Sequence, residues 1–288
     1  MSNGPVSHRD RAALPLAPPA GMRDVLPEEA AERAALARAV LETFARYGYR
    51  RVITPAFEYA EVLERGRATV DRRDLLRFVE PETGEVALLR PDITPQIARI
   101  VATRLGDRPG PWRLAYQGTV LRRSRGRARR RRQLAQAGIE CSGLPGRDAD
   151  VEVIALAARA GAAAGLRGVR IELGHVRFAQ EALAAVPDGA RHAVMQALAA
   201  KDAALLEATL VEARVPKRAR RALLVLPELF GELDVLRQAR RRFRGGAARG
   251  HLDALSSIVE GLEAEGLEAT LGIDLGELRG QAYYTGVS

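Results

Sequence analysis

The sequence predicts an α+β protein in which an antiparallel sheet is flanked by helices and interrupted by a helical insertion. Three observations predict this class. A helical pattern precedes the first strand, two long strands follow one another across a charged loop, and residues 178–265 carry only helical signals. Strands grouped together and helices grouped together favour α+β over an alternating βαβ fold.

The first elements follow from local patterns. Residues 27–48 predict a helix, with acidic residues at its start, apolar residues at four-residue spacing and a glycine at its end. Residues 52–54 are β-branched and precede a proline, which suits a strand end because proline cannot donate to a ladder. Another strand is expected at 85–90, and Thr94 is expected to cap a helix over 94–105.

A hairpin and a helical block make up the rest. Residues 112–122 and 134–141 predict two strands joined by an arginine-rich loop, which normally stands in solvent or over a ligand. The later elements expected are a helix at 148–165, a strand at 169–173, the helical block, a strand at 269–275 and a segment at 278–287 that pairs with it. The chain then divides into a flexible lead-in at 1–20, a core at 21–176, a helical insertion at 177–266 and a return to the core at 267–288.

The formal charge of +9 is concentrated in one loop. Eight arginines and no acidic residue lie between Arg122 and Arg132, and the other 277 residues sum to +1. The excess is therefore local and is not a basic face spread over a fold. Apolar runs are far shorter than the roughly 20 residues of a membrane span. No signal peptide is evident, so we expect a cytoplasmic protein that does not bind a membrane.

The residue patterns of common catalytic and metal sites are missing. Cys141 is the only cysteine, which excludes an intrachain disulfide and a cysteine-built zinc site, and the histidines are scattered. We find no phosphate-binding loop, no nucleophile elbow and no zinc-binding helix. The sequence therefore predicts no catalytic residue, no metal and no cofactor.

Two groups of polar residues are candidates for a ligand site. Asp92 and Thr94 follow a strand and precede a helix, where a carboxylate and a hydroxyl can hold an ammonium group; the alternative is ordinary helix capping. Arg122 precedes the arginine-rich loop, and Gln136 and Glu140 follow it. Because Gln136 and Glu140 are an even number of residues apart, they share one face of the hairpin. The alternative for them is a solvated surface.

A third group lies in residues 274–286. Arg279 offers a guanidinium that can meet a carboxylate, nearby glycines allow close approach of the backbone, and Tyr283 and Tyr284 supply hydroxyls. The alternative is a hairpin whose tyrosines belong to the core.

In this order the three groups resemble the core of class II aminoacyl-tRNA synthetases, specifically the histidyl branch. The segments that carry the resemblance are Gly21-Met22-Arg23-Asp24, Thr54-Pro55, the hairpin after Arg122, and Leu278-Arg279-Gly280-x-x-Tyr283-Tyr284. The resemblance implies a histidine-binding set in which Asp92 meets the ammonium beside Thr94. Its remaining members are Arg122, the motif-two arginine; Gln136 and Glu140, which line the pocket; and Arg279, Tyr283 and Tyr284, which close over the histidine.

The departures from the synthetase pattern concern ATP. Arg122-Arg123-Ser124 lacks the acid that helps to seat ATP, Ala135 stands where histidine is often found, and Ala282 replaces the acid before the tyrosines. The chain reaches Ser288 before any third motif or anticodon-binding domain, so either the sequence is truncated or the protein never activates an amino acid. The resemblance therefore implies no amino-acid activation and argues against tRNA as a partner.

Other stretches are more similar to a family of synthetase paralogues, the regulatory subunits of short-form ATP phosphoribosyltransferase. These stretches are residues 89–99, 150–156, 173–176, 226–231 and 273–280. The resemblance implies a non-catalytic subunit that assembles with the short-form catalytic subunit in the first step of histidine biosynthesis. It also implies L-histidine as an effector and, because residues 51–58 resemble the interface motif of the superfamily, a self-dimer.

Two alternatives stay open from the sequence. A histidyl-tRNA synthetase fragment would show histidine-dependent ATP–pyrophosphate exchange. A basic RNA-binding module working through the arginine loop would show a steeply salt-dependent affinity for RNA that is lost when Arg127 to Arg132 are neutralised.

Overall fold

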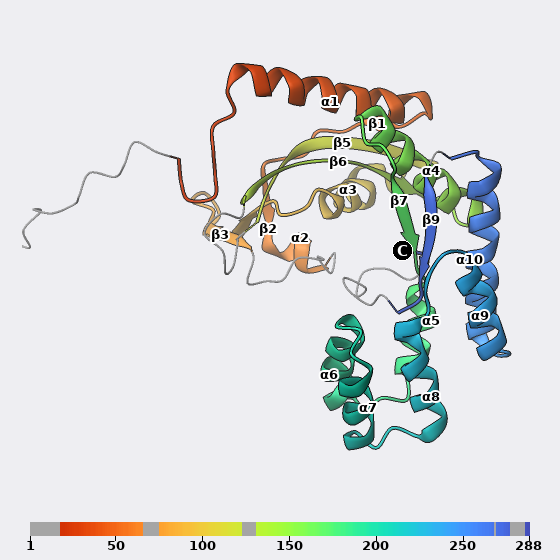
Figure 1. Ribbon diagram of the computed structural model, residues 1–288. Helices are drawn as coiled ribbons and strands as arrows, with labels where there is room; N and C mark the ends of the chain where they lie inside the picture. The colour runs from red at the N-terminus through yellow and green to blue at the C-terminus, as the bar shows by residue number, and fades with distance from the viewer. Residues whose placement is uncertain (1–17, 66–74, 123–130, 268, 277–285) are drawn as a thin grey trace, which may run out of the picture.

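The computed structural model describes residues 18–65, 75–122, 131–267, 269–276 and 286–288. Three three-stranded sheets and the helices around them confirm the predicted α+β class. In Figure 1 the long hairpin crosses the upper half of the molecule, with α1 (Pro27–Arg46) above it and α3 (Thr94–Ile100) below it.

The first sheet is built on the predicted hairpin. β5 (Trp112–Leu121) and β6 (Gln133–Ser142) pair antiparallel along their whole length, with Leu114 opposite Glu140 and Tyr116 opposite Gly138. β1 (Arg50–Arg51) joins the other edge of β5 in parallel. Because side chains alternate along β6, Gln136 and Glu140 share a face of this sheet, as expected.

The strand expected at residues 52–54 is placed differently in the structure. β1 ends at residue 51, and Val52 N donates one further hydrogen bond to Ala115 O at 2.8 Å. The backbone oxygen of Thr54 instead accepts a hydrogen bond from the Arg90 guanidinium at 2.9 Å. The prediction was wrong because strand propensity does not reveal that a distant side chain will occupy these backbone groups.

The second sheet lies beside the start of α3. Its strands, in spatial order, are β2 (Phe57–Tyr59), β4 (Val86–Leu89) and β3 (Leu76–Val79), and α2 (Ala60–Arg65) follows β2. The helix predicted over 94–105 is α-helical only to Ile100, because residues Val101–Leu105 form a π-helix, η2. Val101 and Leu105 still pack against the buried cluster of α3 and β5.

Helices cover both faces of the hairpin. Ala115 faces α1 and α4 (Arg147–Ala163) and shares a buried cluster with Phe44 and Leu156. The next residues on either side, Leu114 and Tyr116, face α3 and pack with its apolar side chains. The period-two alternation of β5 therefore separates an α1/α4 layer from an α3 layer, and the candidate ligand residues lie on the α3 side.

Residues 178–265 are helical apart from one short strand. The helices, which include a 3-10 turn, are α5 (Val176–Leu183), α6 (Asp188–Ala199), α7 (Ala203–Glu212), α8 (Lys217–Val225), η3 (Leu226–Glu228), α9 (Asp234–Arg242) and α10 (Ala247–Ala264). The third sheet has the order β7 (Arg170–Leu173), β9 (Thr270–Asp274) and β8 (Phe230–Gly231). The expectation of helix alone missed β8, because a strand of two residues shows no alternation.

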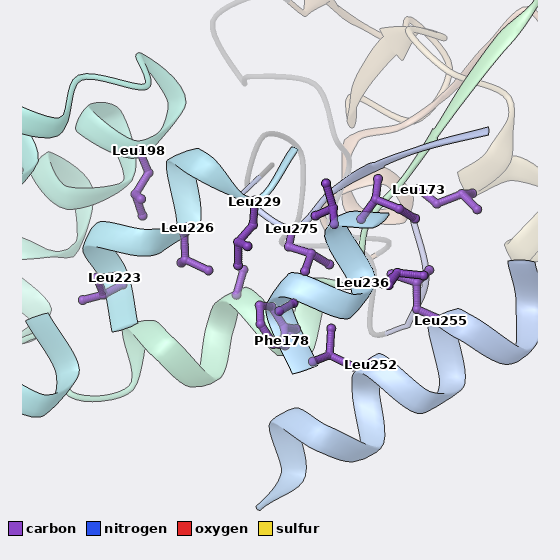
Figure 2. Close-up of a cluster of buried hydrophobic side chains, with 14 of the residues drawn as sticks. Leu173, Phe178, Leu198, Leu223, Leu226, Leu229, Leu236, Leu252, Leu255 and Leu275 are labelled. Atoms are coloured by element: carbon purple, nitrogen blue, oxygen red, sulfur yellow. The ribbon is translucent and has the colours of Figure 1, made fainter. Parts of the chain in front are cut away.

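One hydrophobic core joins these helices to the third sheet. Leu173 of β7, Ile273 of β9 and Leu255 of α10 are at most 2% exposed and belong to one cluster. Figure 2 shows side chains from α9, α10 and the sheet converging on this core. The helical block is therefore packed on β7 and β9 and does not stand apart from them.

The end of the chain corrects one predicted pairing. Residues 278–287 were expected to pair with 269–275, but Val287 bridges His175, and Ser288 exchanges two backbone hydrogen bonds with Gly174. β7 lies along one edge of β9, and β8 covers the other edge at Ile273 and Asp274, so Val287 and Ser288 pair beside Gly174 and not with β9. Residues 277–285 lie outside the described part of the chain.

A stacked histidine pair links this corner to α10, and it predicts a loss of stability in acid. His175 is 7% exposed, and its ring lies 4.4 Å from that of His251, whose Nε2 is 2.9 Å from a Glu181 carboxylate oxygen. Burial, the neighbouring His251 and Arg177 lower the pKa of His175 to about 4. A depressed pKa contributes stability above the ordinary pKa of histidine that is lost as the pH falls toward the folded value.

The titration of one such group lowers the unfolding free energy by up to about 3 kcal/mol between pH 6.5 and 4. We therefore expect this decline to be smaller in His175→Asn than in wild type. Urea denaturation across this range measures it. His192→Asn, at an exposed position of α6, is the control. Parallel pH profiles for wild type and His175→Asn would contradict the assignment.

Candidate functional site

The structure brings four of the predicted ligand residues together. Asp92 and Thr94 lie at the start of α3, and Gln136 and Glu140 project from β6 toward them. The four side chains lie on the α3 side of the hairpin, and each is partly exposed. The even spacing of Gln136 and Glu140 thus predicted the face, and the fold supplies α3 opposite it.

Hydrogen bonds connect the four residues in pairs. The Thr94 hydroxyl donates to Glu140 Oε1 at 2.6 Å, and Gln136 Nε2 donates to Asp92 Oδ1 at 2.8 Å. The backbone N–H of Ile93 donates to Gln136 Oε1 at 3.1 Å, which orients the amide so that its nitrogen faces Asp92. Within the described part of the chain, Asp92 Oδ2 and Glu140 Oε2 accept no hydrogen bond, which leaves them for a ligand donor.

Thr94 does not cap α3 as expected. The residue preceding the helix is Ile93, which makes no side-chain cap, and the Thr94 hydroxyl is committed to Glu140. Asp92 Oδ1 accepts weakly from the Thr94 N–H at 3.3 Å, so a trace of the capping role belongs to Asp92. The predicted capping role therefore falls weakly to Asp92, which remains a candidate ligand residue.

Among the described residues no cation balances the carboxylates of the site. Burial raises the pKa of Glu140, and the nearby negative charge of Asp92 raises it further, while the Thr94 hydrogen bond opposes both effects. Within the described residues neither Asp92 nor Glu140 forms an ion pair with a cationic side chain. Two neighbouring carboxylates without a cation favour a positively charged ligand group such as an ammonium.

Arg122 lies beside this group and is not paired with its carboxylates. Its Nε donates to the Pro91 backbone oxygen at 2.8 Å, and its backbone N–H donates to Arg132 O at 2.9 Å. Arg122 thus ties the end of β5 to the residue before Asp92. Of the other predicted ligand residues, Arg279, Tyr283 and Tyr284 lie outside the described residues.

Tyr116 is a site residue that sequence reasoning missed. Its hydroxyl lies 3.3 Å from the Thr94 hydroxyl, and its ring crosses Gly138 on the opposite strand. A Cβ at Gly138 would lie 2.5 Å from the Tyr116 hydroxyl oxygen and 2.6 Å from the adjoining ring carbon. The absence of a side chain at Gly138 therefore lets Tyr116 reach the site. The sequence alone does not indicate this, because the pairing register of β5 and β6 must first be known.

Gly138→Ala is expected to displace Tyr116 and to destabilise the protein by about 1–3 kcal/mol, the usual range for overpacking. Thermal unfolding measures the change. Gly250→Ala in α10, where a Cβ meets no atom within 4 Å, is the matched control and is expected to be neutral or stabilising. Equal melting temperatures for the two variants would show that Tyr116 moves aside without strain.

A larger groove lies on the opposite face of the hairpin. It has a volume of about 830 Å³ and is lined mainly by alanines and other apolar residues of α1, β5 and β6. Of the four candidate ligand residues, only Gln136 is among its lining residues. The described residues contain no group of three metal-ligating side chains, and no helix among them is long and apolar enough to cross a bilayer.

Comparison with known proteins identifies the family. A family model described as histidyl-tRNA synthetase matches residues 21–288. A protein of Anaeromyxobacter dehalogenans strain 2CP-C, named ATP phosphoribosyltransferase regulatory subunit, is 42% identical over 279 residues, covering 96% of this chain and 79% of the relative. The chain belongs to the ATP phosphoribosyltransferase regulatory subunit family.

Further relatives agree with this membership. The ATP phosphoribosyltransferase regulatory subunit of Moorella thermoacetica is 41% identical and covers 95% of this chain and 71% of its own length. A crystal structure from Bacillus halodurans C, described as an ATP phosphoribosyltransferase regulatory subunit/histidyl-tRNA synthetase, superimposes with a TM-score of 0.85 at 28% identity, covering 100% of this chain and 72% of its own.

The synthetase-like architecture is also confirmed. The histidyl-tRNA synthetase of Nostoc sp. PCC 7120 superimposes with a TM-score of 0.75 at 20% identity, over 95% of this chain and 64% of its own, which establishes a shared fold. Membership of the regulatory subunit family favours that interpretation over a synthetase fragment.

Proposed function

We propose that this chain is a non-catalytic regulatory subunit of short-form ATP phosphoribosyltransferase and that the site between α3 and β6 binds L-histidine as an effector. The observation that carries the proposal is the juxtaposition of Asp92 and Glu140 without a cation among the described residues, each held by one neighbouring polar side chain. The regulatory subunit relatives support the first half of the proposal.

The chemistry of free histidine matches the residues assigned to the site. Asp92 would accept from the ammonium, Glu140 would accept from an imidazole N–H, and Gln136 Nε2 would donate to the other imidazole nitrogen. Thr94 holds Glu140 in position through the 2.6 Å hydrogen bond. By resemblance to the histidyl branch, Arg279 meets the carboxylate, and Tyr283 and Tyr284 close over the ligand.

Regulation requires that two quaternary states bind histidine unequally. A differential affinity corresponding to roughly 1–3 kcal/mol is enough to shift the activity of an assembled enzyme. In the proposal the subunit has no catalytic role of its own, is required for the condensation of ATP with phosphoribosyl pyrophosphate by its partner, and does not bind tRNA.

Two experiments test this function directly. Co-purification with the short-form catalytic subunit, followed by assay of the condensation with and without this chain, tests assembly and stimulation. Calorimetric titration with L-histidine tests the effector site. No complex and no stimulation would refute the subunit assignment, whereas histidine-dependent ATP–pyrophosphate exchange by this chain alone would favour a synthetase activity.

A self-dimer is the expected oligomeric unit. Ile53 is 79% exposed and Phe57 is 42% exposed, so residues 51–58 present apolar side chains outward beside the second sheet. Exposed apolar surface of this kind favours association. We expect light scattering at micromolar concentration to give the mass of at least a dimer and Ile53→Arg to reduce it. A monomeric wild-type protein would contradict the expectation.

A further inference from the structure

The first turn of α8 carries an unusual concentration of positive charge. Between Arg214 and Arg249 there are eleven cationic and three acidic residues, and four of the cations fall within residues 217–221. The helix begins at Lys217 after Pro216, with no acidic residue in its first turn and no side-chain cap. A helix N-terminus already carries a partial positive charge, so cations placed there oppose the helix dipole.

Neighbouring α9 uses its arginines in the opposite way. Arg240, Arg241 and Arg242 lie in its last turn, where the dipole favours cations. Arg240 pairs with Asp253 at 2.6 Å, and Arg242 pairs with Glu228 at 3.0 Å. In contrast, within the described residues the four cations of α8 form no ion pair: Lys217, Arg218, Arg220 and Arg221. These positive charges are therefore available to bind an acidic group that the described residues do not supply.

An apolar groove adjoins this charge. It has a volume of about 380 Å³ and runs between α5 and α8, with the turn between α9 and α10 as its end wall. Phe178 and Phe243 form part of its wall, where their rings meet edge to face with centroids 4.9 Å apart. Alanines of α5 and α8 line its sides, and Arg218 lies on its rim. Figure 1 shows α5 and α8 side by side below the third sheet.

We infer that this groove docks an acidic, amphipathic segment of a partner protein, which inserts apolar side chains between α5 and α8 and places carboxylates over the first turn of α8. Under the proposed function, on which this inference rests, that partner is the catalytic subunit. Carboxylates bound there are attracted both by the four cations and by the positive end of the helix dipole. Their binding therefore offsets the repulsion among these positive charges in the free chain.

Nucleic acid fits this surface less well. Phe178 is only 2% exposed and meets the Phe243 ring edge to face, so the pair does not form a flat platform on which bases could stack. Glu181 also lines the groove, and its carboxylate lies 2.9 Å from His251 Nε2. An apolar side chain can pass over this pair, so a protein segment is the occupant that the groove favours.

Binding of the purified short-form catalytic subunit to the full-length chain tests the inference. The triple variant Lys217→Gln, Arg218→Gln, Arg221→Gln removes the charge, and Ala185→Phe fills the groove from an exposed position of its lining. We expect each to weaken the complex at least about tenfold, and the triple variant also to reduce its salt dependence. Both variants should bind L-histidine as wild type does.

Matched controls separate this surface from general effects. Arg104→Gln with Arg108→Gln removes exposed charge elsewhere, and Ala184→Phe adds the same ring next to the groove lining. Controls are expected to bind like wild type. Wild-type affinity in either test variant would overturn the inference, as would binding of purified tRNA that the triple variant loses while its affinity for the catalytic subunit is unchanged. A wild-type chain that forms no complex would instead refute the proposed function.

Discussion

Glu140→Gln is expected to lower the affinity for L-histidine by about 100-fold or more. Removing one partner of a partly buried charge pair typically changes binding by about 2–5 kcal/mol, because the remaining charge is left uncompensated. In the proposed site the ligand ammonium and imidazole depend on Asp92 and Glu140 together. Calorimetric titration measures the change, and Asp92→Asn is expected to behave in the same way. Histidine inhibition of the assembled enzyme should be relieved in both variants.

The control for this experiment is Glu172→Gln, an exposed carboxylate on β7 whose side chain is 62% exposed. The fold should survive Glu140→Gln. Burial and Asp92 raise the pKa of Glu140, so the stability associated with its protonated form is lost as the pH rises through that raised value. At neutral pH glutamine removes this penalty, and the melting temperature should stay level or rise. Unchanged histidine affinity would show that the site is a relic and that inhibition acts through the catalytic subunit.

Leu255→Ala is expected to destabilise the protein by about 2–5 kcal/mol, the range for truncating a fully buried leucine. Leu255 of α10 is 0% exposed within the core shared by the helical block and the third sheet (Figure 2). The control is Leu205→Ala on α7, the same substitution at a residue that is 50% exposed. Its unfolding free energy is expected to stay within about 0.5 kcal/mol of the wild-type value. Urea denaturation followed by circular dichroism compares them.

This variant also tests how the chain is divided. The division of the chain into a core at 21–176, a helical insertion at 177–266 and a return to the core at 267–288 remains a prediction. Because Leu173 and Ile273 of the sheet pack in the same cluster as the helices, we expect helical and sheet signals to unfold together, and earlier in Leu255→Ala than in wild type. Two separate transitions, with only the helical one shifted, would show that the helical block folds independently of the sheet.

The elements predicted best are those whose evidence is local and repeated. The helix beginning at Pro27 and the hairpin were found within two residues of the expected bounds, because each presents its period over ten or more residues. The same alternation assigned Gln136 and Glu140 to one face. Predictions failed where the evidence was short, as with the two-residue strand β8, or where a side chain replaced a strand, as with Arg90 at Thr54.

By itself the sequence determined the helical and strand periods, the face that carries Gln136 and Glu140, and the family resemblance. Only the tertiary structure decided that Thr94 bonds to Glu140 instead of capping α3, that Tyr116 reaches the site across Gly138, and that the chain end pairs beside Gly174. The physical reason is that hydrogen-bonding groups take the partners that packing brings near, and those partners lie 20 to over 100 residues away, where no local pattern records them.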